Sequence, residues 1–269
     1  MRKARVFVEK EVSDVLRNRQ VFWLYVLLPL LFTILTVGLI AGATLAVELG
    51  ARVASDFTDW IAKVQQAMPE LQGRPLPLAV ATAFYRQVSL LFLLIPVALT
   101  TIAGAYSVVG EKTQKTLEPL LATPATDLEL FLGKALGLLI PAVVVTTVAG
   151  LFVSLAVALF TYFHFGAALL PDVSWLLVLL VISPLVVFLG ILTSLAISSR
   201  AADAQAAQQV AGLLTTPLIL LFVLVFVRGL AVSPRLLGAF AWFLALLDFG
   251  VLCFVVGRFH REEILTRWK

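Results

Sequence analysis

The chain has 269 residues, of which 61% are hydrophobic and only 13% are charged, with a formal net charge of +4. A water-soluble domain carries about 25% charged residues and about 45–50% apolar residues. This composition excludes a soluble enzyme and a disordered chain, and the single cysteine excludes a disulfide scaffold. The sequence therefore predicts an all-α integral membrane protein.

Six long segments carry almost no charge. A hydrocarbon core about 30 Å thick is crossed by about 20 apolar residues in a helix. The uninterrupted Leu, Val and Ile runs do not alternate with polar residues, as membrane strands would. The predicted spans, which together form a transmembrane domain over residues 22–257, are 22–47, 88–109, 132–163, 174–197, 210–227 and 236–257.

The distribution of Lys and Arg predicts the orientation. With six spans both termini lie on one side, and fourteen of the twenty Lys and Arg residues fall on that side. Cytoplasmic segments carry the excess of positive charge. We therefore expect both termini, including the tail 258–269, to be cytoplasmic, and the net charge requires no nucleic-acid partner.

Residues 1–21 are polar but periodic. The apolar residues at helical spacing on one side are Ala4, Val8, Val12, Val15 and Leu16. Such a pattern favours an amphipathic helix along the cytoplasmic membrane face, with its basic residues near lipid headgroups. The alternative is a solvated tail that only sets the topology.

Residues 48–87 form the only sizeable external loop. One helical face of this loop carries Val53, Phe57, Trp60, Ile61, Val64 and Met68. Four acidic and four basic residues leave the loop without net charge. The loop is either an outer lid over a transport path or an amphipathic helix resting on the outer leaflet.

Residues 110–131 predict a short helix between two breaks, on the cytoplasmic side between spans two and three. Thr116 can cap a turn that has Pro119 near its start, and Pro124 ends that turn. Thr126 and Glu129 then form a capping box that opens the third span. We expect a compact cytoplasmic helix that can move as a unit against a partner.

This segment also carries a resemblance to a known family. The matching stretches are Glu111, Thr116-Leu117-Glu118, Leu120-Leu121-Ala122-Thr123-Pro124 and Gly133-Lys134. They resemble the signature of ABC-2-type transporter permeases, the membrane subunits of ATP-binding-cassette exporters. The amphipathic N-terminus is similar to the family's interfacial helix, and the six-span layout with both termini inside also agrees.

The resemblance implies a function and a set of partners. In the family this stretch is the coupling helix, which contacts a separate ATP-binding subunit. The implied contact residues are Glu111, Thr116, Leu117, Glu118, Leu120, Leu121, Thr123 and Pro124. A second permease copy (homodimer or related permease), ATP and Mg on the ATPase subunit, and a location in a prokaryotic plasma membrane are implied too. One departure is the external loop, which here follows span one, whereas many members concentrate external structure between spans five and six.

The chain lacks a phosphate-binding loop. Gly133-Lys134 is followed by Ala135, where that motif requires Ser or Thr. We therefore expect no catalytic residue, cofactor or metal site in this chain, and ATP hydrolysis on another polypeptide.

Three isolated features have other interpretations. Glu262-Glu263 with Arg267 matches an intramembrane protease motif, but it lies in the tail after both histidines, so a solvated helix is the better interpretation. His164 lies among aromatic residues, as is typical of the membrane interface. Asp248, inside the last span, either hydrogen-bonds a neighbouring helix or lines the translocation path. The second option allows an alternative function, an ion-coupled secondary transporter.

Overall fold

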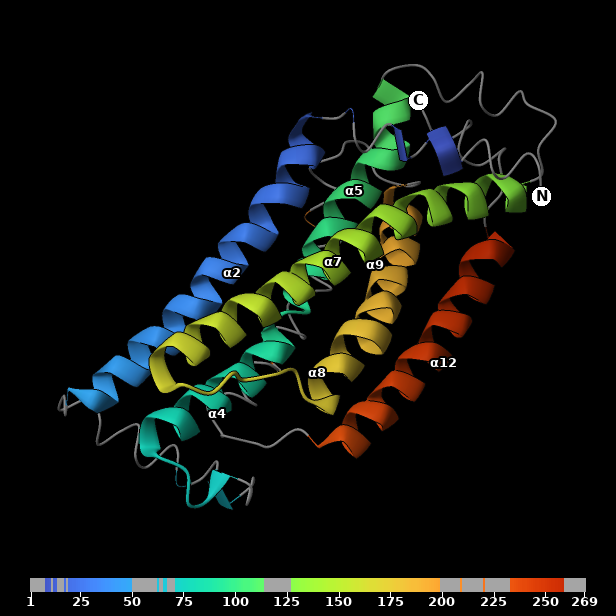
Figure 1. Ribbon diagram of the computed structural model, residues 1–269. Helices are drawn as coiled ribbons and strands as arrows, with labels where there is room; N and C mark the ends of the chain where they lie inside the picture. The colour runs from blue at the N-terminus through green and yellow to red at the C-terminus, as the bar shows by residue number, and fades with distance from the viewer. Residues whose placement is uncertain are drawn as a thin grey trace.

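The computed structural model describes residues 8–10, 12–13, 17, 19–49, 62, 65–66, 71–113, 127–198, 209, 220 and 233–258, and these contain helices but no strand. The helices are α2 (Arg19–Glu48), α4 (Leu76–Leu91), α5 (Leu94–Thr113), α7 (Asp127–Phe165), α8 (Val173–Leu177), the π-helix η2 (Val178–Ile182), α9 (Ser183–Ser198) and α12 (Pro234–Arg258). Figure 1 shows them as a bundle in which α2 and α7 run in one direction and the others run back.

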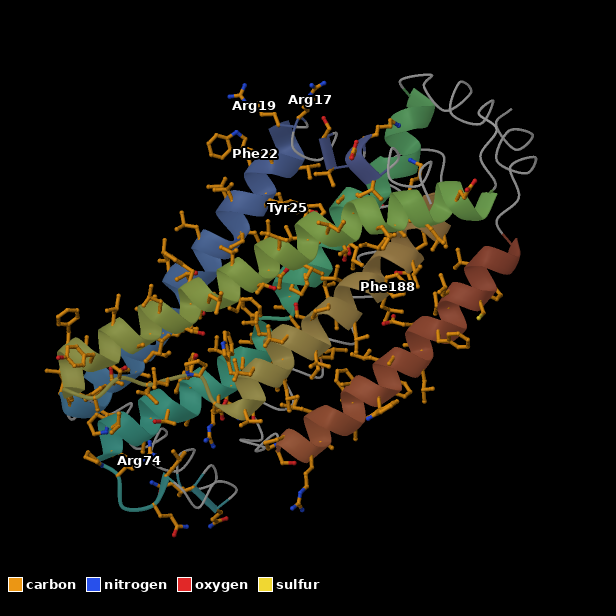
Figure 2. The ribbon with its side chains drawn as sticks, turned by 45° about the vertical axis from the view of Figure 1, so that its right-hand side comes forward. Arg17, Arg19, Phe22, Tyr25, Arg74 and Phe188 are labelled. Carbon is orange, nitrogen blue, oxygen red and sulfur yellow. The ribbon has the colours of Figure 1, made fainter. Side chains whose placement is uncertain are left out.

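We call the end of the bundle where α2 begins the proximal end and the other the distal end. At the proximal end α2 and α7 begin, and α5, α9 and α12 finish (Figure 1). At the distal end α2 and α7 finish, and α4, α8 and α12 begin. Figure 2 shows Arg17 and Arg19 at the proximal end and Arg74 at the distal end.

Five stretches of the described helices are long and apolar enough to cross a membrane. They are Val21–Glu48, Leu76–Thr101, Leu132–Phe165, Val173–Ile197 and Pro234–Val255. Four of them agree with predicted spans one, three, four and six to within a few residues. The predicted fifth span, 210–227, lies outside the described residues except for residue 220, and of the N-terminal segment only residues 8–10, 12–13, 17 and 19–21 are described, all of them helical.

The second span begins earlier than the sequence predicts. We expected it to start at residue 88, after Arg86, but α4 begins at Leu76, so residues 76–87 of the expected external loop are part of a helix. Arg86 does not end the helix because its Nε lies 3.1 Å from Oδ2 of Asp172. The partner on another segment neutralises the charge that served as the boundary.

Two membrane helices are irregular, and a proline follows each irregularity. Pro96 has no N–H to donate to the Phe92 carbonyl, and the chain between α4 and α5 closes with the bonds Leu93 N to Leu90 O and Ile95 N to Phe92 O, each 3.1 Å. Pro184 has no N–H, so it cannot donate a regular helical hydrogen bond to the carbonyl four residues back. The Ser183 N–H donates instead to the Val178 carbonyl, five residues back, which is the π-helical pattern. Both irregular segments contribute to one buried apolar cluster.

The α4–α5 pair lies at the centre of the bundle. In an apolar 18-residue stretch of its span 78% of the residues are buried, against 33% in the corresponding stretches of α2 and α7 and 22% in that of α12. An aromatic group surrounds the break, because Trp175 of α8 packs 5.4 Å from Tyr85 and 5.3 Å from Phe92, measured between ring centroids. The outer faces of α2, α7 and α12 are apolar and exposed, as lipid-facing surfaces are.

Small residues allow α5 and α9 to pack closely. A Cβ placed on Gly190 would lie 2.2 Å from Oγ1 of Thr100, and one on Gly104 would lie 2.5 Å from Oγ of Ser194. The Ser194 hydroxyl donates to the Thr101 carbonyl at 3.2 Å. The crossing therefore has a small residue every fourth position on both helices, as close membrane helix pairs do.

Candidate functional site

The proximal end holds the ends of the helices that flank the predicted coupling segment. α5 finishes at Thr113 and α7 begins at Asp127, and Figure 1 shows both ends at the proximal end. Glu111 lies in the last turn of α5. The other seven predicted contact residues lie in 114–126, outside the described residues. The start of α7 directly after Thr126 agrees with the predicted capping pattern.

α7 connects this end to the membrane interior as one helix. It has 39 residues, which correspond to about 58 Å at 1.5 Å per residue. That is well beyond the roughly 30 Å of a hydrocarbon core. Lys134, two turns after the start of α7, has only 3% of its surface exposed. The proximal part of α7 is thus packed into the protein, and a displacement there reaches the spans.

Asp248 is buried in the interior of the bundle. It is 3% exposed, and neither carboxyl oxygen has a hydrogen-bond partner among the described residues. Leu244, one turn earlier on α12, belongs to the same buried cluster as Val178 and Ile182 of η2. The side chain that the sequence singled out therefore does not face lipid.

The distal end contains a side-chain contact between His164 and Glu48 that the sequence did not predict. Nε2 of His164 lies 3.0 Å from Oε1 of Glu48, which joins the end of α7 to the end of α2. The His164 ring also stacks on Phe160, with ring centroids 5.6 Å apart. Local aromatic neighbours were visible in the sequence, but a partner 116 residues away was not.

An ion pair at the distal end joins α4 to the chain just before α8. Asp172 uses both carboxylate oxygens, because Oδ2 contacts Arg86 and Oδ1 accepts the Trp175 N–H at 2.9 Å. The second bond makes Asp172 the N-cap of α8. One carboxylate therefore fixes where α8 begins and where α4 lies beside it.

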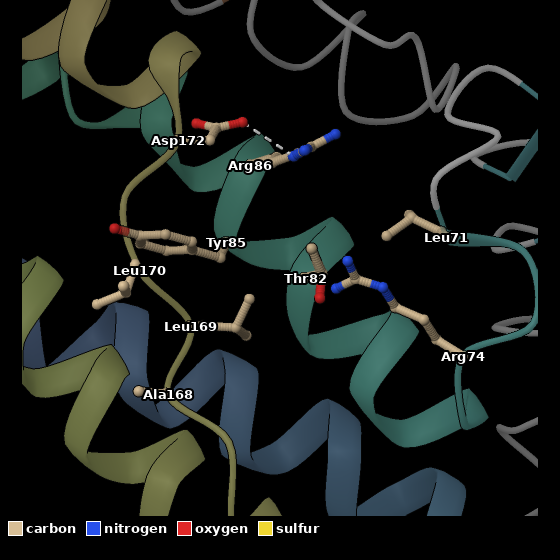
Figure 3. A pocket seen from close by; sticks show the side chains of 9 residues that line it. All are labelled: Leu71, Arg74, Thr82, Tyr85, Arg86, Ala168, Leu169, Leu170 and Asp172. Atoms are coloured by element: carbon tan, nitrogen blue, oxygen red, sulfur yellow. Dashed lines mark ion pairs between the residues drawn. The ribbon is translucent and has the colours of Figure 1, made fainter.

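A cavity of about 240 Å³ lies next to this ion pair (Figure 3). Its polar lining consists of Arg74, Thr82, Tyr85, Arg86 and Asp172. Leu71 and residues 168–170 complete the wall. We refer to it as the distal pocket; the sequence predicted none of it, because its walls come from three separate segments.

No metal centre is present in the described part of the chain, where no three His, Cys, Asp or Glu side chains lie close enough to share an ion.

A comparison with protein families identifies the chain. The family model described as ABC-2 family transporter protein matches residues 5–245, which is most of the sequence. The chain belongs to the ABC-2 transporter family. No match was found among curated proteins.

Membership agrees with the helical bundle described above. ABC-2 proteins are the membrane components of ABC transporters. These membrane components work with an ATP-binding subunit and are not themselves catalytic. The chain is therefore a multi-pass membrane permease of this class. The expected resemblance, which was based on the stretch from Glu111 to Lys134, is confirmed.

Proposed function

We propose that this ABC-2 protein is the permease half of an exporter. In the proposal two permease copies, identical or related, form the translocation path, and two separate subunits bind ATP and Mg. The membrane is the prokaryotic plasma membrane, with the proximal end in the cytoplasm. ATP binding closes the ATPase subunits against residues 116–124, and the spans respond as rigid bodies.

One observation carries this proposal: a short connection joins two membrane helices that both reach the proximal end. Residues 114–126 link α5 to α7, the two helices also pack against each other, and both pack against α9. A force applied to the connection would therefore act on three spans together. Such an arrangement is what a segment needs in order to transmit a movement of a separate ATPase subunit to the membrane helices.

The residues of the connection suit contact with another protein. Leu117, Leu120 and Leu121 supply apolar area for burial against a groove. Glu118 and Glu111 supply carboxylates for basic groups opposite them.

The directions of α9 and α12 support a further membrane crossing between them, which would bring the number of spans to six. α9 finishes at the proximal end, and α12 begins at the distal end (Figure 1). The chain therefore has to travel from one end to the other between Ser198 and Pro234. We propose that residues 210–227 make this crossing as the fifth span.

Co-purification tests the contact with an ATPase. We expect the tagged wild-type protein to bring an ABC ATPase subunit from membranes of its host, and Leu120→Asp or Glu118→Arg to lose it. Leu49→Asp is the matched control, because Leu49 is 81% exposed at the distal end. Equal recovery of the ATPase with Leu120→Asp, Glu118→Arg and Leu49→Asp would contradict the proposed contact.

The structure offers one observation in favour of the alternative, an ion-coupled transporter. Asp248 is the buried carboxyl without a partner among the described residues that such coupling needs. The two functions differ in their energy source. Transport in proteoliposomes that follows an imposed proton or sodium gradient, is lost in Asp248→Asn and does not respond to ATP would favour the alternative.

A further inference from the structure

We propose that the distal pocket binds the phosphate group of a membrane lipid. The pocket has a net positive lining, a position at the ends of the spans and an apolar rim. The inference concerns the distal end only and does not depend on the ATPase contact.

The charges of the pocket favour an anion. Two arginines and one aspartate line it. Asp172 neutralises Arg86, whereas the Arg74 side chain has no hydrogen bond or ion pair to any described residue. Arg74 and Thr82 both line the pocket, and Figure 3 shows them with the other lining side chains. A guanidinium presents several N–H donors in a planar fork, which matches two oxygens of a phosphate.

The position of the pocket selects a lipid as the source of the phosphate. Arg74 lies two residues before the stretch Leu76–Thr101, and Asp172 lies one residue before Val173–Ile197. Residues 168–170 follow closely after the end of Leu132–Phe165. Residues beside three span ends line the pocket, and Thr82, Tyr85 and Arg86 line it from within the second span, which puts the pocket at the distal headgroup level and just below it.

The size and the rim of the pocket suit a headgroup with its chains outside. A cavity of about 240 Å³ holds a group of several atoms, since a water needs about 10–15 Å³. Leu170 on its wall is 71% exposed, and Val173 next to Asp172 is 63% exposed. These apolar side chains offer a surface for acyl chains while the phosphate lies between α4 and residues 168–172.

Two substitutions with opposite effects test the proposal. Arg74→Gln removes the guanidinium that has no partner among the described residues, and we expect at least tenfold weaker binding of phosphatidic acid. Asp172→Asn removes the competing anion from the pocket, while Asn still caps α8. We therefore expect Asp172→Asn to bind phosphatidic acid several-fold more tightly than the wild type.

The experiment is isothermal titration of the full-length protein in neutral detergent with short-chain phosphatidic acid, the matching diacylglycerol and inorganic phosphate. Arg235→Gln is the control, because Arg235 is an exposed arginine at the start of α12, outside the pocket. The proposal is supported if phosphatidic acid binds but diacylglycerol and inorganic phosphate do not, and if Arg74→Gln weakens this binding while Arg235→Gln leaves it unchanged. Equal affinity for inorganic phosphate or for diacylglycerol, or equal losses in Arg74→Gln and Arg235→Gln, would overturn it.

Discussion

Two aspartates in this protein have opposite environments. Asp172 has a partner for each carboxylate oxygen, whereas both oxygens of Asp248 lack one among the described residues. A charge inside a membrane helix costs about 2.5–3.5 kcal/mol on insertion scales. The two carboxyl groups should therefore contribute very differently to stability.

We predict that the unfolding temperature of Asp248→Asn is no lower than that of the wild type, because no described group stabilises a negative charge at Asp248. Asp172→Ala should lower stability by about 1–3 kcal/mol, since it removes a helix cap and an ion-pair partner. Thermal unfolding in detergent, followed by tryptophan fluorescence, measures both. A clear loss of stability in Asp248→Asn would show that the structure depends on that charge.

At the scale of elements, two glycines, Gly104 and Gly190, allow α5 and α9 to cross closely. Thr100 cannot easily make room for a Cβ on Gly190, because its hydroxyl already donates to the Pro96 carbonyl at 2.9 Å. Close approach of the backbones replaces the hydrophobic effect as the source of helix association in lipid.

We predict that Gly190→Ala destabilises the protein by about 1–3 kcal/mol, the usual cost of overpacking. Gly42→Ala on α2 is the matched control, because a Cβ there would have nothing within 4 Å. The unfolding temperatures of the two variants should separate clearly. If both variants unfold together with the wild type, the close contact between α5 and α9 is not important for stability.

The sequence predicted the positions of some membrane spans well and that of another poorly. Charge-free length alone located spans one, three, four and six, because the bilayer imposes that length on any crossing helix. It misplaced the start of span two, since Arg86 looked like a boundary and its partner Asp172 lies 86 residues further on. The distal pocket could not be predicted for the same reason: sequence spacing does not show which distant segments meet.

The whole molecule has two different ends. The proximal end carries the connection between α5 and α7, and the distal end carries the Arg86–Asp172 ion pair, the His164–Glu48 contact and the pocket. The excess of Lys and Arg on the proximal side predicts that this side is cytoplasmic.

Cysteine labelling tests this orientation. In a Cys253→Ala background, Gln72→Cys at the distal end should react with a membrane-impermeant maleimide in intact cells. Arg17→Cys and Ala125→Cys should react only after the membrane is permeabilised, because we expect them inside. The reverse pattern would place the proposed coupling segment outside the cell and rule out contact with a cytosolic ATPase.

We propose that an ATPase on another polypeptide drives this permease through residues 116–124. The most direct measurement is the ATP hydrolysis rate of the co-purified ATPase subunit in proteoliposomes, with wild-type permease or with Leu120→Asp. We predict that wild-type permease changes the rate and that Leu120→Asp leaves it at the value of the ATPase alone. If wild-type permease and Leu120→Asp change the rate of ATP hydrolysis equally, residues 116–124 do not couple this permease to the ATPase.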